Sequence, residues 1–299
     1  MEFRSIFISN PAQLSVRKGQ LIIRQDEEVS IPMEDISSIL LESKAVSITA
    51  AALQELTEYG VTVYLCDAVH LPAAVVLPMN RHSRQLKLLK GQIAMSKPTQ
   101  KRIWQAVVTA KIANQAACLT LLGHPEGNEL RFLATQVRSG DPDNLEATAA
   151  ARYFPILFGP GFTRGEECRV NAALNYGYAI LRGAVARNLV MRGLEPCLGI
   201  FHHSELNQFN LADDLMEPYR PLADLFVASQ VSDDDGPLTP AIKQQLFHLT
   251  NYLVQQNGRQ FRAITAIGRM ADSFSRIVQG ETGSMELPSL LPLQPYRYE

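Results

Sequence analysis

A short stretch between residues 198 and 221 gathers side chains that can bind a metal ion. It contains two histidines, two glutamates and two aspartates, which are His202, His203, Glu205, Asp213, Asp214 and Glu217. Carboxylates that crowd together repel one another, and a divalent cation is a common way to offset that repulsion. Imidazole nitrogen combined with carboxylate oxygen suits manganese or magnesium better than a structural zinc site. The stretch therefore predicts a site for Mg²⁺ or Mn²⁺.

The acids of this stretch have two explanations. If a helix begins near Asn210, Asp213 and Asp214 lie one turn before Glu217, so at least one of them shares its face. Pro218 predicts that the helix breaks or restarts there, which leaves Glu217 at a junction. The acids could be metal ligands, or they could simply favour a helix N-terminus through its dipole. We favour the dipole explanation for Asp213 and the ligand role for Glu217.

The neighbouring segments offer further polar side chains. His202 and His203 are adjacent, so in an extended segment they point to opposite sides and at most one faces the site. The preceding helical pattern places Asn171, Asn175 and Arg182 roughly along one stripe. These three side chains could orient metal ligands or contact phosphates, and a solvent-exposed helix face explains them equally well.

Positive charge is concentrated in one part of a chain whose net charge is only -2. No Asp or Glu occurs between Ala68 and Pro125. The basic residues there are Arg81, Arg84, Lys87, Lys90, Lys97, Lys101, Arg102 and Lys111. A basic surface beside an acidic pocket suits a polyanion that is held in one place and cut or joined in another. Charge alone favours the simpler alternative, two solvated helix faces of opposite sign.

The remaining composition argues against other protein classes. The four cysteines are far apart and form no CxxC pair, so they are expected to be reduced and mostly buried. The N-terminus lacks a basic region followed by a long apolar core, and no apolar run approaches the length needed to span a membrane. We expect a cytoplasmic protein without a membrane partner.

The first part of the chain predicts a mostly β domain over residues 1–78. Strands are expected at 4–9, 13–16 and 20–24, with a turn at Lys18 and Gly19, and again near Val29 and Ile39. A short helix is expected from residues 47–49 to Gly60, followed by a strand at 61–66.

Long helical patterns after Pro78 predict a larger, all-α domain over residues 84–299, which makes the fold class α+β. Pro98 marks the start of one helix. Further helices are expected at 145–158, 170–192, 218–231, 240–255 and 260–279. The tail from Leu287 is too rich in proline for a helix, so it is expected to be an arm that docks on a partner or a disordered end.

Glu146 has a local explanation of its own. It stands three residues after Asp143, which is the spacing of a helix capping box with Asp143 at the cap. Capping alone would explain this glutamate, and nothing in its spacing connects it with His202.

Several motifs, in order along nearly the whole chain, resemble one family. They are RSIFISNP at 4–11, ILLESKAVS at 39–47, CDAVHLP at 66–72, HSRQ at 82–85, KRIWQ at 101–105, KIANQ at 111–115, NLEA at 144–147, NAALNYGY at 171–178 and the stretch 202–221. The sequence resembles the CRISPR-associated protein number one, the adaptation endonuclease and integrase, in the form that accompanies type II systems.

This resemblance implies a metal site that joins three parts of the helical domain. Family members bind a divalent metal through a glutamate, a histidine and an acid, and these positions match Glu146, His202 and Glu217. The family histidine lies about fifteen residues before the final acid, which selects His202 over His203. Some relatives use a second acid one turn earlier, which falls on Asp214.

The resemblance also implies an assembly and a reaction. It implies a homodimer paired mainly through the N-terminal domains, and two dimers around a dimer of the small second CRISPR-associated protein, spanning a short DNA duplex. The 3′-hydroxyl of a captured DNA fragment attacks a phosphodiester at the edge of a CRISPR repeat. We expect Arg81, Arg84, Lys101 and Arg102 to bind phosphates. The alternatives are a structure-selective metal-dependent nuclease and a non-catalytic DNA scaffold.

Overall fold

The N-terminal part of the chain forms two small sheets that share one apolar core. The computed structural model describes residues 4–77, 84–231 and 236–296. One sheet has the order β1-β5-β7-β8 and the other β4-β3-β2-β6. Their strands are β1 (Arg4–Ile8), β2 (Ala12–Arg17), β3 (Gln20–Arg24), β4 (Glu28–Pro32), β5 (Ile36–Leu41), β6 (Val46–Ile48), β7 (Thr62–Cys66) and β8 (Pro72–Val76). The predicted strands are confirmed, while β6 and β8 were not predicted.

Local chemistry explains the turns and the helix of this part. Lys18 and Gly19 both have positive φ, 53° and 71°, as a two-residue hairpin turn between twisted strands requires. Helix α1 (Ala50–Glu58) begins where the side chain of Thr49 accepts a hydrogen bond from the backbone of Ala52. The predicted turn and short helix are therefore confirmed.

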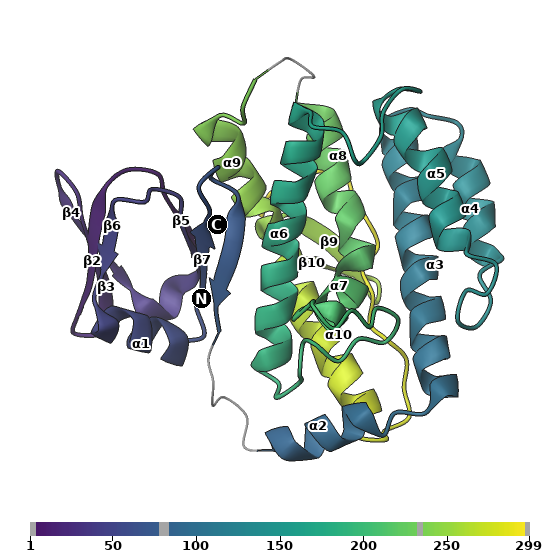
Figure 1. The fold of residues 1–299 in the computed structure, drawn as a ribbon, viewed down its shortest axis with the longest axis horizontal. Coiled ribbons are helices and arrows are strands. Elements are labelled where there is room, and N and C mark those ends of the chain that lie inside the picture. The colour runs from purple at the N-terminus through teal and green to yellow at the C-terminus, as the bar shows by residue number, and fades with distance from the viewer. Residues whose placement is uncertain (1–3, 78–83, 232–235, 297–299) are drawn as a thin grey trace.

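The second part consists mainly of helices (Figure 1). They are α2 (Gln85–Ile93), α3 (Lys97–Leu121), α4 (Gly127–Thr135), α5 (Leu145–Phe158), α6 (Arg169–Val190), α7 (Asn210–Met216), α8 (Arg220–Gln230), α9 (Pro240–Phe247) and α10 (Ala263–Val278). The single turn η2 (Glu217–Tyr219) joins α7 to α8. Another single turn, η3 (His248–Asn251), follows α9. Ser96 caps α3 by accepting a hydrogen bond from the backbone of Thr99, and Pro98 lies in the first turn, as predicted. None of the helices in the described ranges is long and apolar enough to cross a membrane.

The prediction of an all-α second domain is wrong at one place. Strands β9 (Leu253–Gln256) and β10 (Arg259–Arg262) form an antiparallel hairpin where the ends of two helices were expected. Asn257 and Gly258 make its turn with positive φ values of 51° and 75°. Asn-Gly is a strong signal for a two-residue hairpin turn, and it prevails over the helical spacing of the flanking apolar residues.

The proline-rich tail packs against its own domain. Ser289 and Gln255 exchange two backbone hydrogen bonds of 2.7 and 2.9 Å, so the tail extends the hairpin. Leu290 is buried, and its backbone N–H donates to Oδ1 of Asn114 in α3 at 2.9 Å. Over its described part the tail is therefore neither a free arm nor a disordered end.

The two parts of the molecule meet along β7 and α6. The hydroxyl of Tyr64 donates to the backbone carbonyl of Ile180 at 3.0 Å. A Cβ at Gly183 would lie 2.2 Å from the Tyr64 ring, so only glycine allows this approach. Lys243 on α9 also reaches Glu42, which follows β5, at 3.1 Å with both side chains buried. The expected boundary, residues 78 to 84, falls almost entirely outside the described residues.

Candidate functional site

A buried lysine links two of the three proposed metal ligands. Lys111 on α3 donates to Oε1 of Glu146 at the start of α5, and its Nζ lies 2.5 Å from Oε2 of Glu217 in η2. The side chains of Lys111 and Glu217 are 8% and 6% exposed, and that of Glu146 is 28% exposed. The tertiary fold thus brings together two glutamates that are 71 residues apart, and it does so through a cation.

The electrostatic balance around Glu217 keeps it ionised. Burial raises the pKa of Glu217, but Arg220, Lys111 and His202 outweigh burial and hold that pKa below its ordinary value. Burial likewise lowers the pKa of Lys111, and the charges of Glu217 and Glu146 outweigh it, so that pKa lies above its ordinary value. The buried site therefore contains charged groups of both signs.

Asp214 holds His202 and its loop in place. Its carboxylate accepts backbone hydrogen bonds from Ile200, Phe201 and His202 at 2.6, 2.9 and 3.2 Å, and it is completely buried. Oδ1 also lies 2.6 Å from Nδ1 of His202. The imidazole can therefore carry its proton on Nδ1 and present Nε2 outward, as a carboxylate does for a metal-binding histidine. This use of Asp214 favours a positioning role over the ligand role that the resemblance suggested.

Asp214 also favours the protonated, charged form of the His202 imidazole. The hydrogen bond to Asp214 raises the pKa of His202 above its ordinary value, although partial burial opposes that shift. The His202 side chain is 47% exposed, so its outward edge is open to solvent. His202 is thus a fixed imidazole at the surface edge of the site.

Asp213 forms an ion pair with Arg182. It pairs with Arg182 on α6 through two hydrogen bonds of 2.6 and 3.0 Å, and Asn207 donates to it at 2.7 Å. The fully occupied carboxylate of Asp213 argues against a metal role and ties α7 to α6. The same pairing uses the guanidinium of Arg182, which was expected to contact DNA.

The other two members of the expected DNA-binding stripe also have partners within the chain. Asn171 is buried, and its amide donates to the backbone carbonyls of Thr163 and Glu166 at 2.7 and 2.9 Å. Arg164 donates to Oδ1 of Asn171 and, at 2.9 Å, to Oδ1 of Asn175. Asn171 and Asn175 therefore hold the loop before α6, whereas Arg182 ties α6 to α7.

A second buried network stands behind Glu217. Asp224 is buried and accepts hydrogen bonds from the hydroxyls of Tyr178 and Tyr153, the latter at 3.1 Å. The guanidinium of Arg220 lies 4.8 Å from the Tyr178 ring centroid, and its Nε lies 3.1 Å from Oε1 of Glu217. Burial raises the pKa of Asp224 to about 6, although the two tyrosine hydrogen bonds oppose that shift. Arg220 is thereby fixed between the network and Glu217.

The capping box proposed for Asp143 and Glu146 is wrong. Asp141 accepts the backbone hydrogen bonds of Leu145 and Glu146 at 2.9 and 3.0 Å. Asp143 instead forms two hydrogen bonds with Arg138, at 2.6 and 2.9 Å. The φ of Asp141 is positive, 49°, a backbone conformation that Asp tolerates better than most residues. The Glu146 side chain is consequently not needed for capping.

The expected phosphate-binding residues divide into two groups. Arg84, Lys101 and Arg102 are exposed at the beginnings of α2 and α3, as a phosphate contact requires. Arg81 lies outside the described residues. Lys111, which the sequence placed in the same basic segment, points inward to Glu146 and Glu217.

The three proposed ligands are chemically suited to a hard divalent cation, although Lys111 lies between Glu146 and Glu217. Among the residues that the structure describes, no three His, Cys, Asp or Glu side chains are close enough together to hold a metal. Glu146 and Glu217 meet only through the ammonium of Lys111, while His202 faces Asp214. Two carboxylates and an imidazole fixed through its other nitrogen match the ligands that Mg²⁺ and Mn²⁺ accept.

Lys111 and Arg220 are the site residues that sequence reasoning missed. Lys111 lies four residues after Val107, and both occupy the buried face of α3. A lysine at an inward helical position signals a buried ion pair. Arg220 stands three residues after Glu217, the spacing at which a helical ion pair forms.

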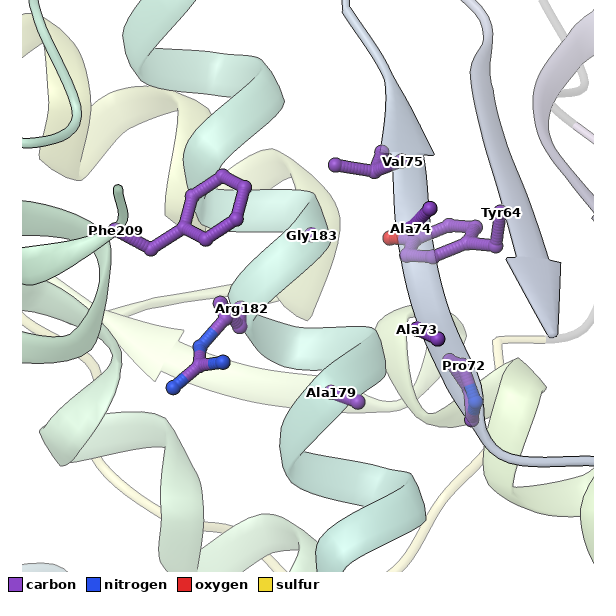
Figure 2. Close-up of a pocket in the computed structure, with 9 residues that line it drawn as sticks. All are labelled: Tyr64, Pro72, Ala73, Ala74, Val75, Ala179, Arg182, Gly183 and Phe209. Atoms are coloured by element: carbon purple, nitrogen blue, oxygen red, sulfur yellow. The ribbon is translucent and has the colours of Figure 1, made fainter. Parts of the chain in front are cut away.

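A small cavity lies at the junction of the two parts and away from Lys111. Figure 2 shows that strand β8 supplies one wall, while Arg182 and Gly183 of α6 and Phe209 line the other side. Its volume is about 60 Å³. This is far below the several hundred Å³ of a pocket that encloses a small-molecule ligand.

Comparison with known proteins gives consistent matches. The profile of a family described as CRISPR associated protein Cas1 matches residues 6–236. The chain is 45% identical over 304 residues to the CRISPR-associated endonuclease Cas1 of Neisseria meningitidis serogroup C (strain 8013), with all of both chains covered. It is 30% identical to a CRISPR-associated endonuclease Cas1 of Thermus thermophilus, covering 77% of this chain and 75% of that protein.

Solved structures share the fold at lower identity. A casposase bound to an integration product superposes with a TM-score of 0.77 at 20% identity, covering 95% of this chain and 92% of that one. A Cas1 protein from Thermotoga maritima gives a TM-score of 0.74 at 14% identity, covering 94% and 99%. These neighbours share the architecture of a strand-rich first part and a helical second part.

Proposed function

Because this chain belongs to the CRISPR associated protein Cas1 family, we propose that it is a metal-dependent DNA endonuclease and integrase that inserts DNA fragments into a CRISPR repeat array. The observation that carries the proposal is the meeting of Glu146, Glu217 and their shared cation, with His202 held by Asp214 on the neighbouring α7 segment. The full-length relative that is 45% identical is named an endonuclease.

We assign Glu146, His202 and Glu217 to a bound Mg²⁺ or Mn²⁺. The cation would lower the pKa of an attacking hydroxyl and offset the negative charge that grows on the phosphate. Arg220 keeps Glu217 ionised and fixes one of its oxygens. Asp214 orients His202, whose exposed edge is available to a ligand from outside. The proposed site thus comprises an imidazole held by Asp214 and two glutamates that Lys111 links.

The proposed reaction exchanges one phosphodiester for another. The 3′-hydroxyl of the fragment forms a bond to phosphorus and loses its proton, while the bond to the 3′-oxygen of the repeat strand breaks and that oxygen gains a proton. With water in place of the hydroxyl, the same site hydrolyses DNA. Arg84, Lys101 and Arg102 would bind phosphates without reading sequence, together with Arg81.

The proposed assembly is a homodimer that joins the small second CRISPR-associated protein, as two dimers around one partner dimer. One neighbour with a TM-score of 0.71 and 19% identity is a Cas6-RT-Cas1–Cas2 complex, although this chain covers only 35% of that protein. The name of that neighbour supports a complex of this chain with the second CRISPR-associated protein, and the number of dimers is part of our proposal.

An integration assay separates the three candidate activities. A labelled DNA fragment with free 3′-hydroxyls is incubated with a repeat-bearing supercoiled plasmid, Mn²⁺ and the second CRISPR-associated protein. Integration gives a covalent fragment–plasmid product that disappears when the fragment ends in 3′-deoxynucleotides. Nicking without that product indicates a nuclease. The absence of both the covalent product and nicking indicates a scaffold.

The assignment of the site is tested in the same assay with isosteric changes. Glu217→Gln should abolish the product because it removes a charged oxygen donor. Glu42→Gln is a matched control, since Glu42 is also a buried glutamate paired with a lysine. Equal activity of the Glu217→Gln variant and the wild type would reject the proposed site.

A further inference from the structure

We propose that Lys111 is a built-in competitor of the divalent cation: its ammonium bridges Glu146 and Glu217, so a cation that takes both carboxylates must displace it. The inference rests on the proposed function, because it takes these two glutamates as metal ligands. It assigns to Lys111 a role in controlling metal binding.

The geometry makes the competition direct. One ammonium contacts Oε1 of Glu146 and lies 2.5 Å from Oε2 of Glu217, so it occupies the place between the carboxylates. A divalent cation that used the same two side chains would stand close to a fixed positive charge. Two like charges a few ångströms apart in a buried site repel strongly, so a divalent cation bound to these carboxylates should displace the ammonium.

Lys111 is the cation that can move. Arg220 holds the other oxygen of Glu217, and its guanidinium is packed over Tyr178, which in turn donates to the buried Asp224. Lys111 has a flexible four-carbon stem and a compact ammonium with three donors, so it can change its partner without moving helix α3. The site therefore combines one fixed cation with one exchangeable cation.

Displacement couples metal binding to substrate binding. An ammonium driven from its carboxylates needs another anion, and a phosphodiester at the site would supply one. DNA should then help metal to bind, and metal should help DNA to bind by the same factor. Without DNA, Lys111 should keep the affinity for metal low.

The experiment measures Mn²⁺ affinity of the full chain without DNA, by electron paramagnetic resonance of the free ion. We expect Lys111→Met to bind Mn²⁺ about tenfold more tightly than the wild type, because the competing charge is gone. Lys243→Met is the matched control, since Lys243 is also a buried lysine paired with a glutamate and lies elsewhere. It should lower stability and leave Mn²⁺ affinity unchanged.

The remaining outcomes separate this inference from the proposed function. His202→Ala should weaken Mn²⁺ binding; if it does not, the proposed metal site itself fails. If His202→Ala weakens binding while Lys111→Met binds Mn²⁺ no more tightly than the wild type, only the competition is rejected.

Thermal unfolding provides a second readout that tolerates a destabilised variant. In the presence of a chelator, the Lys111→Met and Lys111→Gln variants should have lower melting temperatures than the wild type, because the carboxylates of Glu146 and Glu217 lose their counter-charge. Mn²⁺ should then raise their melting temperatures by more than that of the wild type. A smaller or equal rise in both variants would overturn the inference.

Discussion

Nε of Arg220 lies 3.1 Å from Oε1 of Glu217, three residues earlier in the chain, while the other oxygen of Glu217 faces Lys111. One carboxylate is thus held between a buried lysine and a partly exposed arginine that come from different elements. This relationship explains why a buried glutamate stays ionised, and it joins the network around Asp224 to the proposed metal site.

The pair of Arg220 and Glu217 should matter for stability far more than a surface pair. Arg220→Ala leaves a buried carboxylate with only Lys111 as its counter-charge, so we expect the free energy of unfolding to fall by about 1.5–3 kcal/mol. Arg17→Ala serves as the control because Arg17, 61% exposed, pairs with Glu28 at the surface, where the loss should be at most about 1 kcal/mol. Urea unfolding at neutral pH measures both, and equal losses would contradict the account.

The contribution of Asp224 to stability should depend on pH. Burial raises its folded pKa from 3.8 to about 6, so between these values the folded state holds a proton that the unfolded state has lost. Stability from this group is therefore fully present below pH 4, falls as the pH rises to about 6 and is then constant. The fall should amount to about 3 kcal/mol.

Asp224→Asn removes this titration and isolates it from other groups. We expect the difference in unfolding free energy between the wild type and Asp224→Asn to change between pH 4 and pH 6.5 in the stated direction. A difference that stays constant over this range would show that Asp224 titrates normally.

Asp214 should control the protonation of His202. The hydrogen bond from Nδ1 of His202 to Asp214 favours the charged imidazole. Asp214→Asn should therefore lower the pKa of His202, which NMR titration of the metal-free protein can follow. Asp272→Asn, which alters a partly exposed pair with Arg192, is the control and should leave that pKa unchanged. An unaltered pKa in Asp214→Asn would refute the positioning role.

The exposed bases at the starts of α2 and α3 should bind DNA through its phosphates. Reversing Arg84, Lys101 and Arg102 to glutamate should weaken binding of a short duplex at every sequence tested. It should also reduce the slope of log affinity against log salt by about 0.9 for each lost contact. Lys18→Glu, an exposed change in the β2–β3 turn, is the control. An unchanged salt slope in the triple variant would count against these contacts.

Much of the fold follows from local sequence signals. Thr49, Ser96 and the turn at Lys18 and Gly19 act through bonds or backbone angles set within a few residues, so the sequence reveals them directly. The hairpin at Asn257 was missed although its turn signal is equally local, because the flanking apolar spacing also fits a helix. The docking of the tail depends on Asn114, 176 residues before Leu290, and no local pattern carries that information.

The residues of the proposed site also divide into those that local sequence reveals and those that depend on tertiary packing. The sequence drew attention to His202 and Glu217 because they are neighbours, whereas Glu146 joined them only through family resemblance. The role of Lys111 was missed because its charge suggested a surface position, while its spacing from Val107 placed it on the buried face of α3. Long-range ion pairs depend on how helices pack, and packing is fixed by the whole core.

The central claim, that Glu146, His202 and Glu217 hold a divalent cation, is tested most directly by anomalous diffraction from crystals containing Mn²⁺. We expect an anomalous peak about 2.1 Å from a carboxylate oxygen of each glutamate and from Nε2 of His202. Lys111 should have moved away from both glutamates. A Mn²⁺ peak elsewhere, with Lys111 still bridging Glu146 and Glu217 at saturating metal, would contradict it.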